Sequence, residues 1–266
     1  MSGRLEGKVA FVTGGRGGIG RAICARFVRE GAVVYAADLS DAGSMSSAVQ
    51  DDARFIRLDV TSEEETIAAM AEVGKNSGKL DILVNAAGIE LEKTIEHTTL
   101  DEWNRSFAVN VTGTFLASKH ALPLLRMAAT GGLTASIINF GSYDGFIADP
   151  GLAAYCATKG AVHALTRAMA VDHGPESIRV NAICPGYVDT PMLQSFFSGA
   201  GSGGEGGTID SLKEAVRNVH PIRNYGTPDD IANLVNRLAS DEVRYASGQL
   251  WVLDGGLSAQ VQQMRL

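Results

Sequence analysis

Residues 9–20 read VAFVTGGRGGIG. The first five residues form an apolar run typical of a buried β-strand, and glycines interrupt it from Gly14 onward. Glycine lets the backbone turn tightly and approach a pyrophosphate, and the helical pattern that follows would present free N–H groups to that anion. The stretch therefore predicts a strand, a phosphate-binding turn and a helix, with an ordinary strand–helix turn as the alternative. The turn residues expected against a dinucleotide are Gly14, Arg16, Gly18, Ile19 and Gly20.

The same alternation of strand and helix continues along the whole chain. Strands are predicted over Val9–Thr13, Val33–Ala37, Phe55–Leu58, Ile82–Asn85, Ser136–Phe140, Arg179–Ile183 and Gln249–Val252. Helical patterns cover Ile19–Glu30, Glu63–Val73, Leu100–Arg126, Ala153–Asp172 and Asp229–Ala239. The strands lack polar alternation, as parallel strands buried on both faces do. We therefore expect one α/β domain over residues 1–266, a doubly wound and mostly parallel seven-stranded sheet with helices on both faces.

An acidic residue ends the second predicted strand. Asp38 lies 24 residues after Gly14, near the ~20 expected of an acid that binds the adenosine ribose hydroxyls. A carboxylate there repels the 2′-phosphate of NADP, so Asp38, with Leu39 beside it, predicts NAD as the cofactor. Arg16 could instead attract that phosphate, and Asp38 could be a solvated loop acid, so both alternatives stay open.

The pair Tyr155 and Lys159 carries the strongest chemical signal. Positions i and i+4 share one face of a helix, so the phenol and the ammonium can point into the same site. A free phenol has a pKa of about 10, and a neighbouring cation favours phenolate. We expect Lys159, together with an oxidised nicotinamide, to lower the pKa of Tyr155, which can then exchange a proton with an alcohol or carbonyl.

Two further residues complete a set that resembles the single-domain branch of the short-chain dehydrogenase/reductase family. Ser142 lies 13 residues before Tyr155, just past a predicted strand end, and Asn110 lies in the run Asn110-Val111-Thr112-Gly113. The resemblance runs from Lys8 to Gly256 and implies a Rossmann-type fold. It implies that Ser142 bonds the substrate oxygen, that Lys159 also binds the nicotinamide ribose, and that Asn110 supports a water chain to Lys159. Asn110 could instead bond only to backbone.

The resemblance places more of the chain around the cofactor. It implies contacts to the adenosine half from Asn85, Ala86, Ala87 and Gly88, and to the adenine ring from Asp59 and Val60. A loop-capping role is a rival for Asp59. It also implies that the turn after the sixth strand closes over the nicotinamide through Pro185, Gly186, Val188 and Thr190.

The segments expected around the substrate are apolar, aromatic and acidic. They read Ile89–Glu92, Tyr143–Ile147, Tyr187 and Met192–Phe197, and the residues expected to contact substrate are Ser142, Asp144, Tyr155 and Tyr187. Arginine is missing from these segments, and Lys93 is the one candidate cation near them. An anionic substrate favours such cations, so we expect a neutral secondary alcohol or ketone.

Composition limits the partners. The net charge is −7, which argues against a nucleic-acid partner. No apolar run approaches the ~20 residues of a membrane helix. The three cysteines, Cys24, Cys156 and Cys184, lack metal-site spacing, so we expect no metal and a reducing, cytoplasmic location. The resemblance implies a homotetramer formed through the helices at Leu100–Arg126 and Ala153–Asp172 and the last strand.

Two other functions compete with an NAD-linked oxidoreductase. An NADPH-dependent ketoreductase of 3-oxoacyl-type substrates is disfavoured by Asp38. A non-catalytic nucleotide-binding scaffold is disfavoured by the intact set of four residues. A glycine-rich segment, Ser198–Gly207, is expected to belong to a mobile substrate lid at about residues 190–220, with a solvent loop of no function as the alternative.

Overall fold

The seven predicted strands form one parallel sheet in the computed structural model, which describes residues 3–39, 53–200 and 209–260. The sheet order is β3-β2-β1-β4-β5-β6-β7. Their bounds are β1 Val9–Thr13, β2 Val33–Asp38, β3 Ala53–Arg57, β4 Ile82–Asn85, β5 Ala135–Phe140, β6 Ile178–Pro185 and β7 Leu250–Leu253. Strand order reverses between β1 and β4, and ligands of open α/β sheets bind where the carboxyl ends of strands flank such a reversal.

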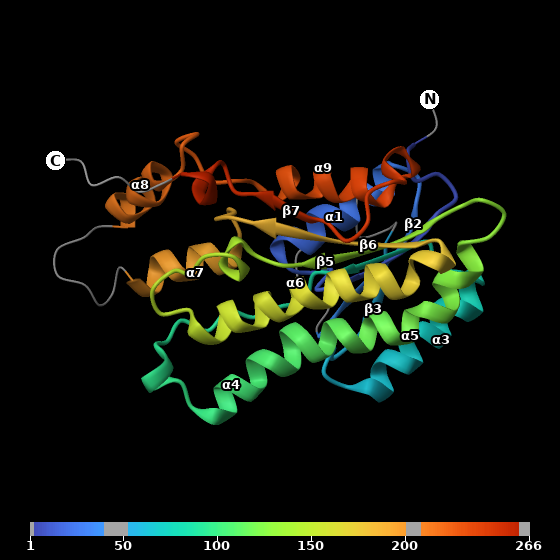
Figure 1. The fold of residues 1–266 in the computed structure, drawn as a ribbon, viewed down its shortest axis with the longest axis horizontal. Coiled ribbons are helices and arrows are strands. Elements are labelled where there is room, and N and C mark those ends of the chain that lie inside the picture. The colour runs from blue at the N-terminus through green and yellow to red at the C-terminus, as the bar shows by residue number, and fades with distance from the viewer. Residues whose placement is uncertain (1–2, 40–52, 201–208, 261–266) are drawn as a thin grey trace.

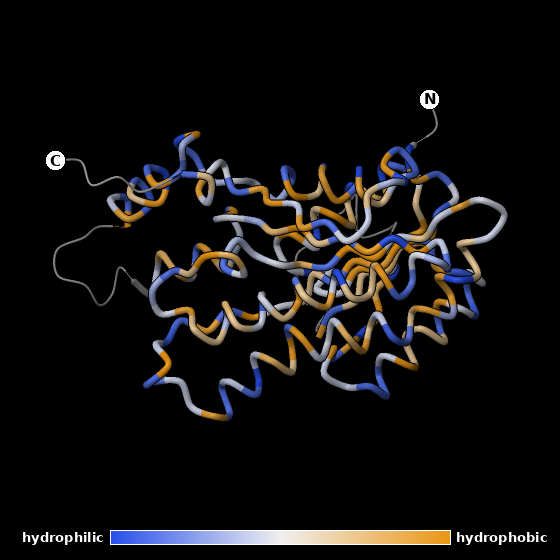
Figure 2. Tube along the Cα trace, in the orientation of Figure 1, coloured by the Kyte–Doolittle hydropathy of each residue, from blue (hydrophilic) through white to orange (hydrophobic). Residues whose placement is uncertain are grey.

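Helices cover both faces of this sheet, as Figure 1 shows. One face carries α1 (Gly18–Arg29) and α9 (Pro228–Ala239), and the other carries α3 (Glu63–Ser77), α5 (Gly113–Ala128) and α6 (Ala153–His173). The strands are apolar along their length because each is covered twice, and Figure 2 shows hydrophobic residues concentrated in them. The expected doubly wound α/β fold is confirmed.

One predicted helix is wrong as a single element. The run Leu100–Arg126 divides into α4 (Leu100–Phe107), a π-helical turn (Ala108–Thr112) and α5. The turn carries Asn110, whose side chain bonds outside the helix, and π-turns often mark such functional positions. Periodicity alone does not distinguish this extra residue per turn from a continuous α-helix.

Beyond β6 the chain forms α7 (Pro191–Ala200) and α8 (Ile209–Val219). A small apolar cluster of Leu193, Phe197 and Val216 packs these two helices together, apart from the main core. Most of the glycine-rich segment Ser198–Gly207 lies outside the described residues. Within the described chain, no helix has both the length and the hydropathy that a membrane crossing requires.

Candidate active site

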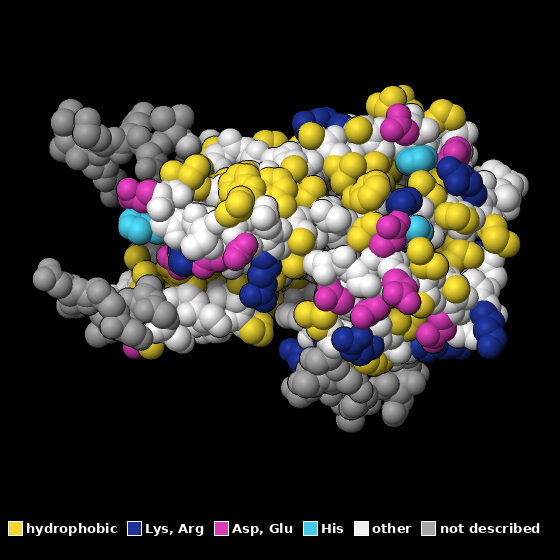
Figure 3. Space-filling view, turned by 90° about the horizontal axis from the view of Figure 1, so that it is seen from below, with side chains coloured by type: hydrophobic (Ala, Val, Ile, Leu, Met, Phe, Trp, Pro, Cys, Tyr) yellow, Lys and Arg dark blue, Asp and Glu magenta, His cyan; other side chains and the backbone are white. Residues whose placement is uncertain are grey.

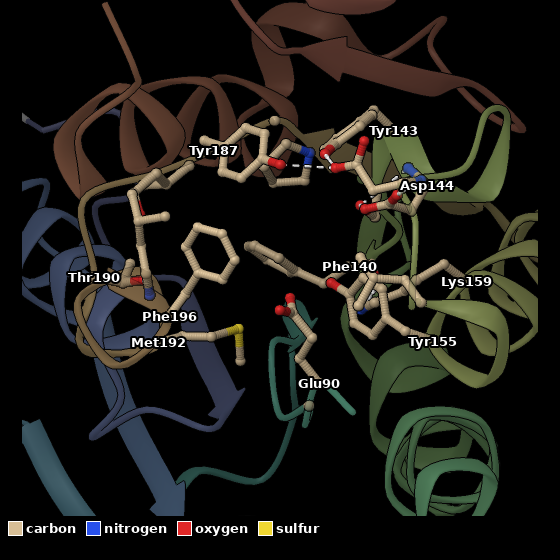
Figure 4. A pocket seen from close by; sticks show the side chains of 18 of the residues that line it. Glu90, Phe140, Tyr143, Asp144, Tyr155, Lys159, Tyr187, Thr190, Met192 and Phe196 are labelled. Atoms are coloured by element: carbon tan, nitrogen blue, oxygen red, sulfur yellow. Dashed lines mark hydrogen bonds between the residues drawn. The ribbon is translucent and has the colours of Figure 1, made fainter. Parts of the chain in front are cut away.

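A cavity of about 390 Å³ opens at the carboxyl ends of β4, β5 and β6. Figure 4 shows side chains from four segments that converge on it: the chain after β4, the chain after β5, the start of α6, and the chain from Pro185 to α7. Its lining includes Ile19, Ala86, Gly88, Glu90, Glu92, Ser142, Tyr143, Asp144, Asp149, Tyr155, Lys159, Pro185, Gly186, Tyr187, Val188, Thr190, Met192 and Phe196. Residues predicted separately for catalysis, cofactor and substrate thus line one space.

Tyr155 and Lys159 enter the cavity from the first turns of α6. The Lys159 ammonium lies 5.3 Å from the centre of the Tyr155 ring and donates a 2.9 Å hydrogen bond to the carbonyl of Phe140, the last residue of β5. Lys159 is buried. The bond to Phe140 fixes the ammonium between the helix and the sheet edge.

The protein groups around Tyr155 raise the pKa of its phenol, whereas the expected lowering also depends on the charge of an oxidised nicotinamide. Burial of the ring raises the pKa of this phenol, and the negative charges of Glu90 and Asp144 raise it further, while the Ser142 hydroxyl acts in the opposite direction. Burial also lowers the pKa of the Lys159 ammonium, to about 8. Sequence spacing identified the neighbouring lysine but not the desolvation and the carboxylates of Glu90 and Asp144, which raise this pKa.

Asn110 lies behind these residues rather than in the cavity lining. Its side chain accepts a 2.8 Å hydrogen bond from the Ile89 N–H and donates to the Ile89 carbonyl at 2.9 Å and to Thr158 Oγ at 3.0 Å. It therefore joins the π-turn, the chain after β4 and α6. Asn110 thus bonds to a side chain as well as to backbone groups, whereas the alternative expected bonds to backbone alone.

Ser142 follows β5 and is bonded twice to one neighbour. Its hydroxyl accepts from the Asp144 N–H at 3.1 Å and donates to Asp144 Oδ2 at 3.1 Å. Both residues are buried. Burial raises the pKa of Asp144 to about 6, and the charge of Asp149 raises it as well, against the lowering effect of bonds from the Asp149 N–H and Ser142.

Asp149 organises one wall of the cavity, and sequence reasoning missed it. Its Oδ2 accepts hydrogen bonds from the hydroxyls of Tyr143 and Tyr187, the latter at 2.8 Å. Figure 4 shows Tyr187 and Tyr143 directed toward each other across this wall. Asp149 lies in a loop that carries no motif, so no local pattern indicates a carboxylate shared by two phenols.

The glycine turn forms a close-packed cradle beside the cavity. Gly14 has a φ of 64°, and a Cβ there would lie 2.8 Å from the Ala87 backbone. A Cβ on Gly20 would lie 2.0 Å from the Gly14 carbonyl oxygen. No side chain in the described chain caps α1, whose first turn also lacks acids. The open helix start and the small residues fit the pyrophosphate of a dinucleotide.

At the far end of the cradle, Asp38 accepts hydrogen bonds from the N–H of Arg16 at 3.0 Å and of Leu39 at 2.8 Å. The Arg16 guanidinium lies 4.9 Å from the centre of the Phe55 ring. The acid and the base named as rivals for cofactor choice are therefore neighbours at one end of the turn.

Other predicted cofactor residues have structural partners of their own. Asp59 Oδ1 accepts from the N–H and hydroxyl of Thr61 at 2.9 and 2.7 Å, the geometry of a loop cap. The Asn85 amide donates to Ser118 of α5 and to Asn139 of the neighbouring strand β5. Val60 packs against Gly113, where a Cβ would meet its Cγ2 at 2.8 Å. These three residues lie outside the cavity lining.

The cavity is acidic. Among its described lining residues, Glu90, Glu92, Asp144 and Asp149 carry carboxylates and Lys159 alone carries a positive charge. Lys93, the candidate cation, instead forms a 2.6 Å ion pair with Glu102. The described residues contain no group of three or more His, Cys, Asp or Glu side chains placed to hold a metal ion.

Comparison with known proteins agrees with this architecture. A family model described as enoyl-(acyl carrier protein) reductase matches residues 14–258. The chain is 39% identical over 264 residues to 2-(S)-hydroxypropyl-CoM dehydrogenase 3 of Xanthobacter autotrophicus, covering 97% of this chain and 100% of that protein. It is 37% identical over 268 residues to the NADP-dependent (R)-specific alcohol dehydrogenase of Lentilactobacillus kefiri, covering 98% and 100%. The ligand-free aldohexose dehydrogenase of Thermoplasma acidophilum superposes with a TM-score of 0.90 at 33% identity, covering 100% of both chains.

Proposed function

This chain belongs to the short-chain dehydrogenase/reductase family, and we propose that it transfers a hydride between NAD(H) and a neutral secondary alcohol or ketone. The convergence of Ser142, Tyr155 and Lys159 on one cavity beside the glycine cradle carries the proposal. Relatives named as alcohol and hydroxysteroid dehydrogenases support the same reaction class. A bound nicotinamide supplies the hydride chemistry, and the protein supplies orientation and proton transfer.

Each catalytic side chain has a separate task in this proposal. Ser142 holds the substrate oxygen beside the Tyr155 hydroxyl, and Tyr155 takes a proton from an alcohol or gives one to a carbonyl. Lys159 contributes positive charge close to the Tyr155 ring and binds ribose hydroxyls of the cofactor. Asn110 holds the chain after β4 against α6. Near neutral pH the phenol of Tyr155 is protonated and can donate to a carbonyl, although burial and the carboxylates of Glu90 and Asp144 raise its pKa and so make it a weaker acid.

The preference for NAD rests on Asp38. Its carboxylate is anchored by two N–H groups at the end of β2, where the adenosine ribose of a cofactor in the cradle would lie. A 2′-phosphate would meet this negative charge. The NADP-dependent relative shows that the family also uses the phosphorylated cofactor, and Arg16 is the residue that would then receive the phosphate. The proposed contacts to the cofactor also include Gly14, Gly18, Ile19 and Gly20 of the glycine turn.

The neutral substrate is inferred from the charge of the cavity. Four carboxylates outnumber the one buried lysine and repel an anion, and aromatic side chains such as Tyr187 and Phe196 favour apolar contact. We further propose a cytoplasmic homotetramer. Figure 3 views the molecule from the side of α4 and α5 and shows hydrophobic side chains gathered on that face. Leu100 of α4, Phe115 and Met127 of α5, and Val171 of α6 are exposed hydrophobic residues of the helices expected to form the interface.

The test is reduction of NAD or NADP with a panel of neutral secondary alcohols, hydroxy acids and a 3-hydroxyacyl thioester. We expect turnover with NAD and a neutral alcohol. Tyr155→Phe keeps the ring and removes the proton, so turnover should fall by the ~10²–10⁴ typical of general acid–base catalysis. Tyr245→Phe, which removes the hydroxyl of an exposed tyrosine outside the cavity, is the matched control and should retain the turnover. Near-native turnover of Tyr155→Phe would refute the assignment, and preference for the thioester would replace the substrate class.

A further inference from the structure

We infer that Asp144 sets the direction of the Ser142 hydrogen bond, so that its protonation state decides whether Ser142 accepts from an alcohol or donates to a ketone. Asp144 is thus a positioning residue that acts through Ser142. The inference rests on the proposed function, because it assigns the substrate oxygen to Ser142.

When Asp144 is ionised, the Ser142 hydroxyl proton is already used in a hydrogen bond to Asp144. The hydroxyl accepts from the Asp144 N–H and donates to Asp144 Oδ2, each at 3.1 Å. A hydroxyl has one donor and two acceptor positions. What remains for the cavity is one acceptor position, which suits the O–H of an alcohol and does not suit a carbonyl oxygen.

Protonation of Asp144 reverses this arrangement. Asp144 Oδ1 already accepts the Asp149 N–H at 3.2 Å and lies 3.9 Å from the Cys156 thiol, so the proton must reside on Oδ2. A protonated Oδ2 donates to Ser142. With both acceptor positions filled, the Ser142 proton then points to the cavity, where it can bond a carbonyl oxygen.

Few of the other ionisable groups around Asp144 titrate near pH 6, where Asp144 itself gains its proton. Burial raises the pKa values of the surrounding phenols Tyr143, Tyr155 and Tyr187 and of the Cys156 and Cys184 thiols. Burial lowers the pKa of His163 to about 4 and that of Lys159 to about 8.

Three carboxylates besides Asp144 line the same cavity. Asp149 is bound by two phenols, and its charge raises the pKa of Asp144. Burial raises the pKa of Glu90, and Asp144 and Glu92 raise it further. The experiment must therefore distinguish the titration of Asp144 from the titration of Glu90.

Asp144→Asn reproduces the protonated state permanently. The fixed Asp149 N–H requires the amide oxygen at the Oδ1 position, so the amide NH₂ faces Ser142 and donates to it. The affinity for the ketone in the presence of NADH should rise, and that for the alcohol in the presence of NAD should fall. Each change should be about threefold to tenfold, the worth of one uncharged hydrogen bond.

The experiment measures KM and kcat in both directions from pH 5 to 9 for the native protein, Asp144→Asn and Glu90→Gln. In the native protein, ketone affinity should rise and alcohol affinity fall as the pH drops through about 6, where Asp144 gains its proton. Asp144→Asn should abolish this pH dependence. Glu90→Gln removes a cavity charge without touching Ser142 and should retain it.

A change in the same direction for both substrates in Asp144→Asn, or loss of the pH dependence in Glu90→Gln, would overturn the inference. A second readout does not need activity. The ¹³C carboxyl resonance of Asp144, titrated without ligands, should move its midpoint upward in Ser142→Ala, because the Ser142 bond lowers the pKa of Asp144. An unmoved midpoint overturns the coupling. Absence of hydride transfer from every alcohol, with the midpoint shift observed, would overturn the proposed function instead.

Discussion

Removing the Asn110 side chain is the sharpest test of how this site is held together. Asn110 makes three hydrogen bonds, two with the Ile89 backbone and one with Thr158, at 2.8–3.0 Å. It is 2% exposed and Thr158 is fully buried, so water replaces few of these bonds after Asn110→Ala. The substitution therefore leaves the backbone N–H and carbonyl of Ile89 to find new partners and removes the bond that Thr158 accepts, while the Thr158 hydroxyl still donates to the Tyr155 carbonyl at 2.7 Å.

The expected loss of stability follows from this count. A buried hydrogen bond contributes about 0.5–1.5 kcal/mol net, so three bonds give about 2–4 kcal/mol for Asn110→Ala. Ile89 is only half-buried and regains some hydration, which places the expectation near ~3 kcal/mol. Turnover should also fall, because the chain released with Ile89 includes the cavity residues Gly88 and Glu90.

Equilibrium unfolding in urea measures this loss of stability. A double-mutant cycle with Thr158→Val isolates the contribution of the hydrogen bond between Asn110 and Thr158. Thr158→Val alone should cost about 1–3 kcal/mol, because it removes both the bond accepted from Asn110 and the bond donated to the Tyr155 carbonyl. Because the two residues bond to each other, the double substitution should cost about 1 kcal/mol less than the sum of the single ones. A loss below about 1 kcal/mol for Asn110→Ala, or strict additivity in the cycle, would refute the structural role assigned to Asn110.

Three further outcomes are expected. Asp38→Ser should weaken NAD and improve NADP relative to it in steady-state kinetics, and a native preference for NADP would assign Arg16 to the phosphate. Light scattering at micromolar concentration should give four chains of 27.9 kDa, whereas a monomer mass would contradict the assembly. Amide exchange across Met192–Val219 should slow when cofactor and substrate both bind, and unchanged exchange in the ternary complex would exclude a lid there.

The sequence predicted the fold well because parallel buried strands leave a local signature. Each expected strand lies within two residues of its position in the sheet, and the glycine turn follows β1 directly. The predicted strand Arg179–Ile183 ends too early, because β6 continues through Cys184 to Pro185 and composition does not indicate where a buried strand ends. The π-turn at Asn110 was hidden because one extra residue barely disturbs a helical pattern.

The cavity was only partly predictable, for a physical reason. Tyr155 and Lys159 are four residues apart on one helix, so geometry alone brings them together. Asp149, by contrast, meets Tyr187 from 38 residues away, and no local rule relates the two. Glu90 faces the same space from the chain after β4, and its effect on Tyr155 depends on a distance that the sequence does not contain.

These long-range contacts change the chemistry expected from the motif. A tyrosine beside a lysine suggests a phenol with a lowered pKa, yet burial and the carboxylates of Glu90 and Asp144 raise the pKa of Tyr155. Desolvation also lowers the pKa of the neighbouring Lys159 ammonium, to about 8. Positive charge must therefore enter the site before the phenolate becomes accessible, and an oxidised nicotinamide carries such a charge. In the proposed reaction both directions involve this phenolate, because proton abstraction from an alcohol starts from it and proton donation to a ketone produces it, and in both cases the oxidised nicotinamide accompanies it.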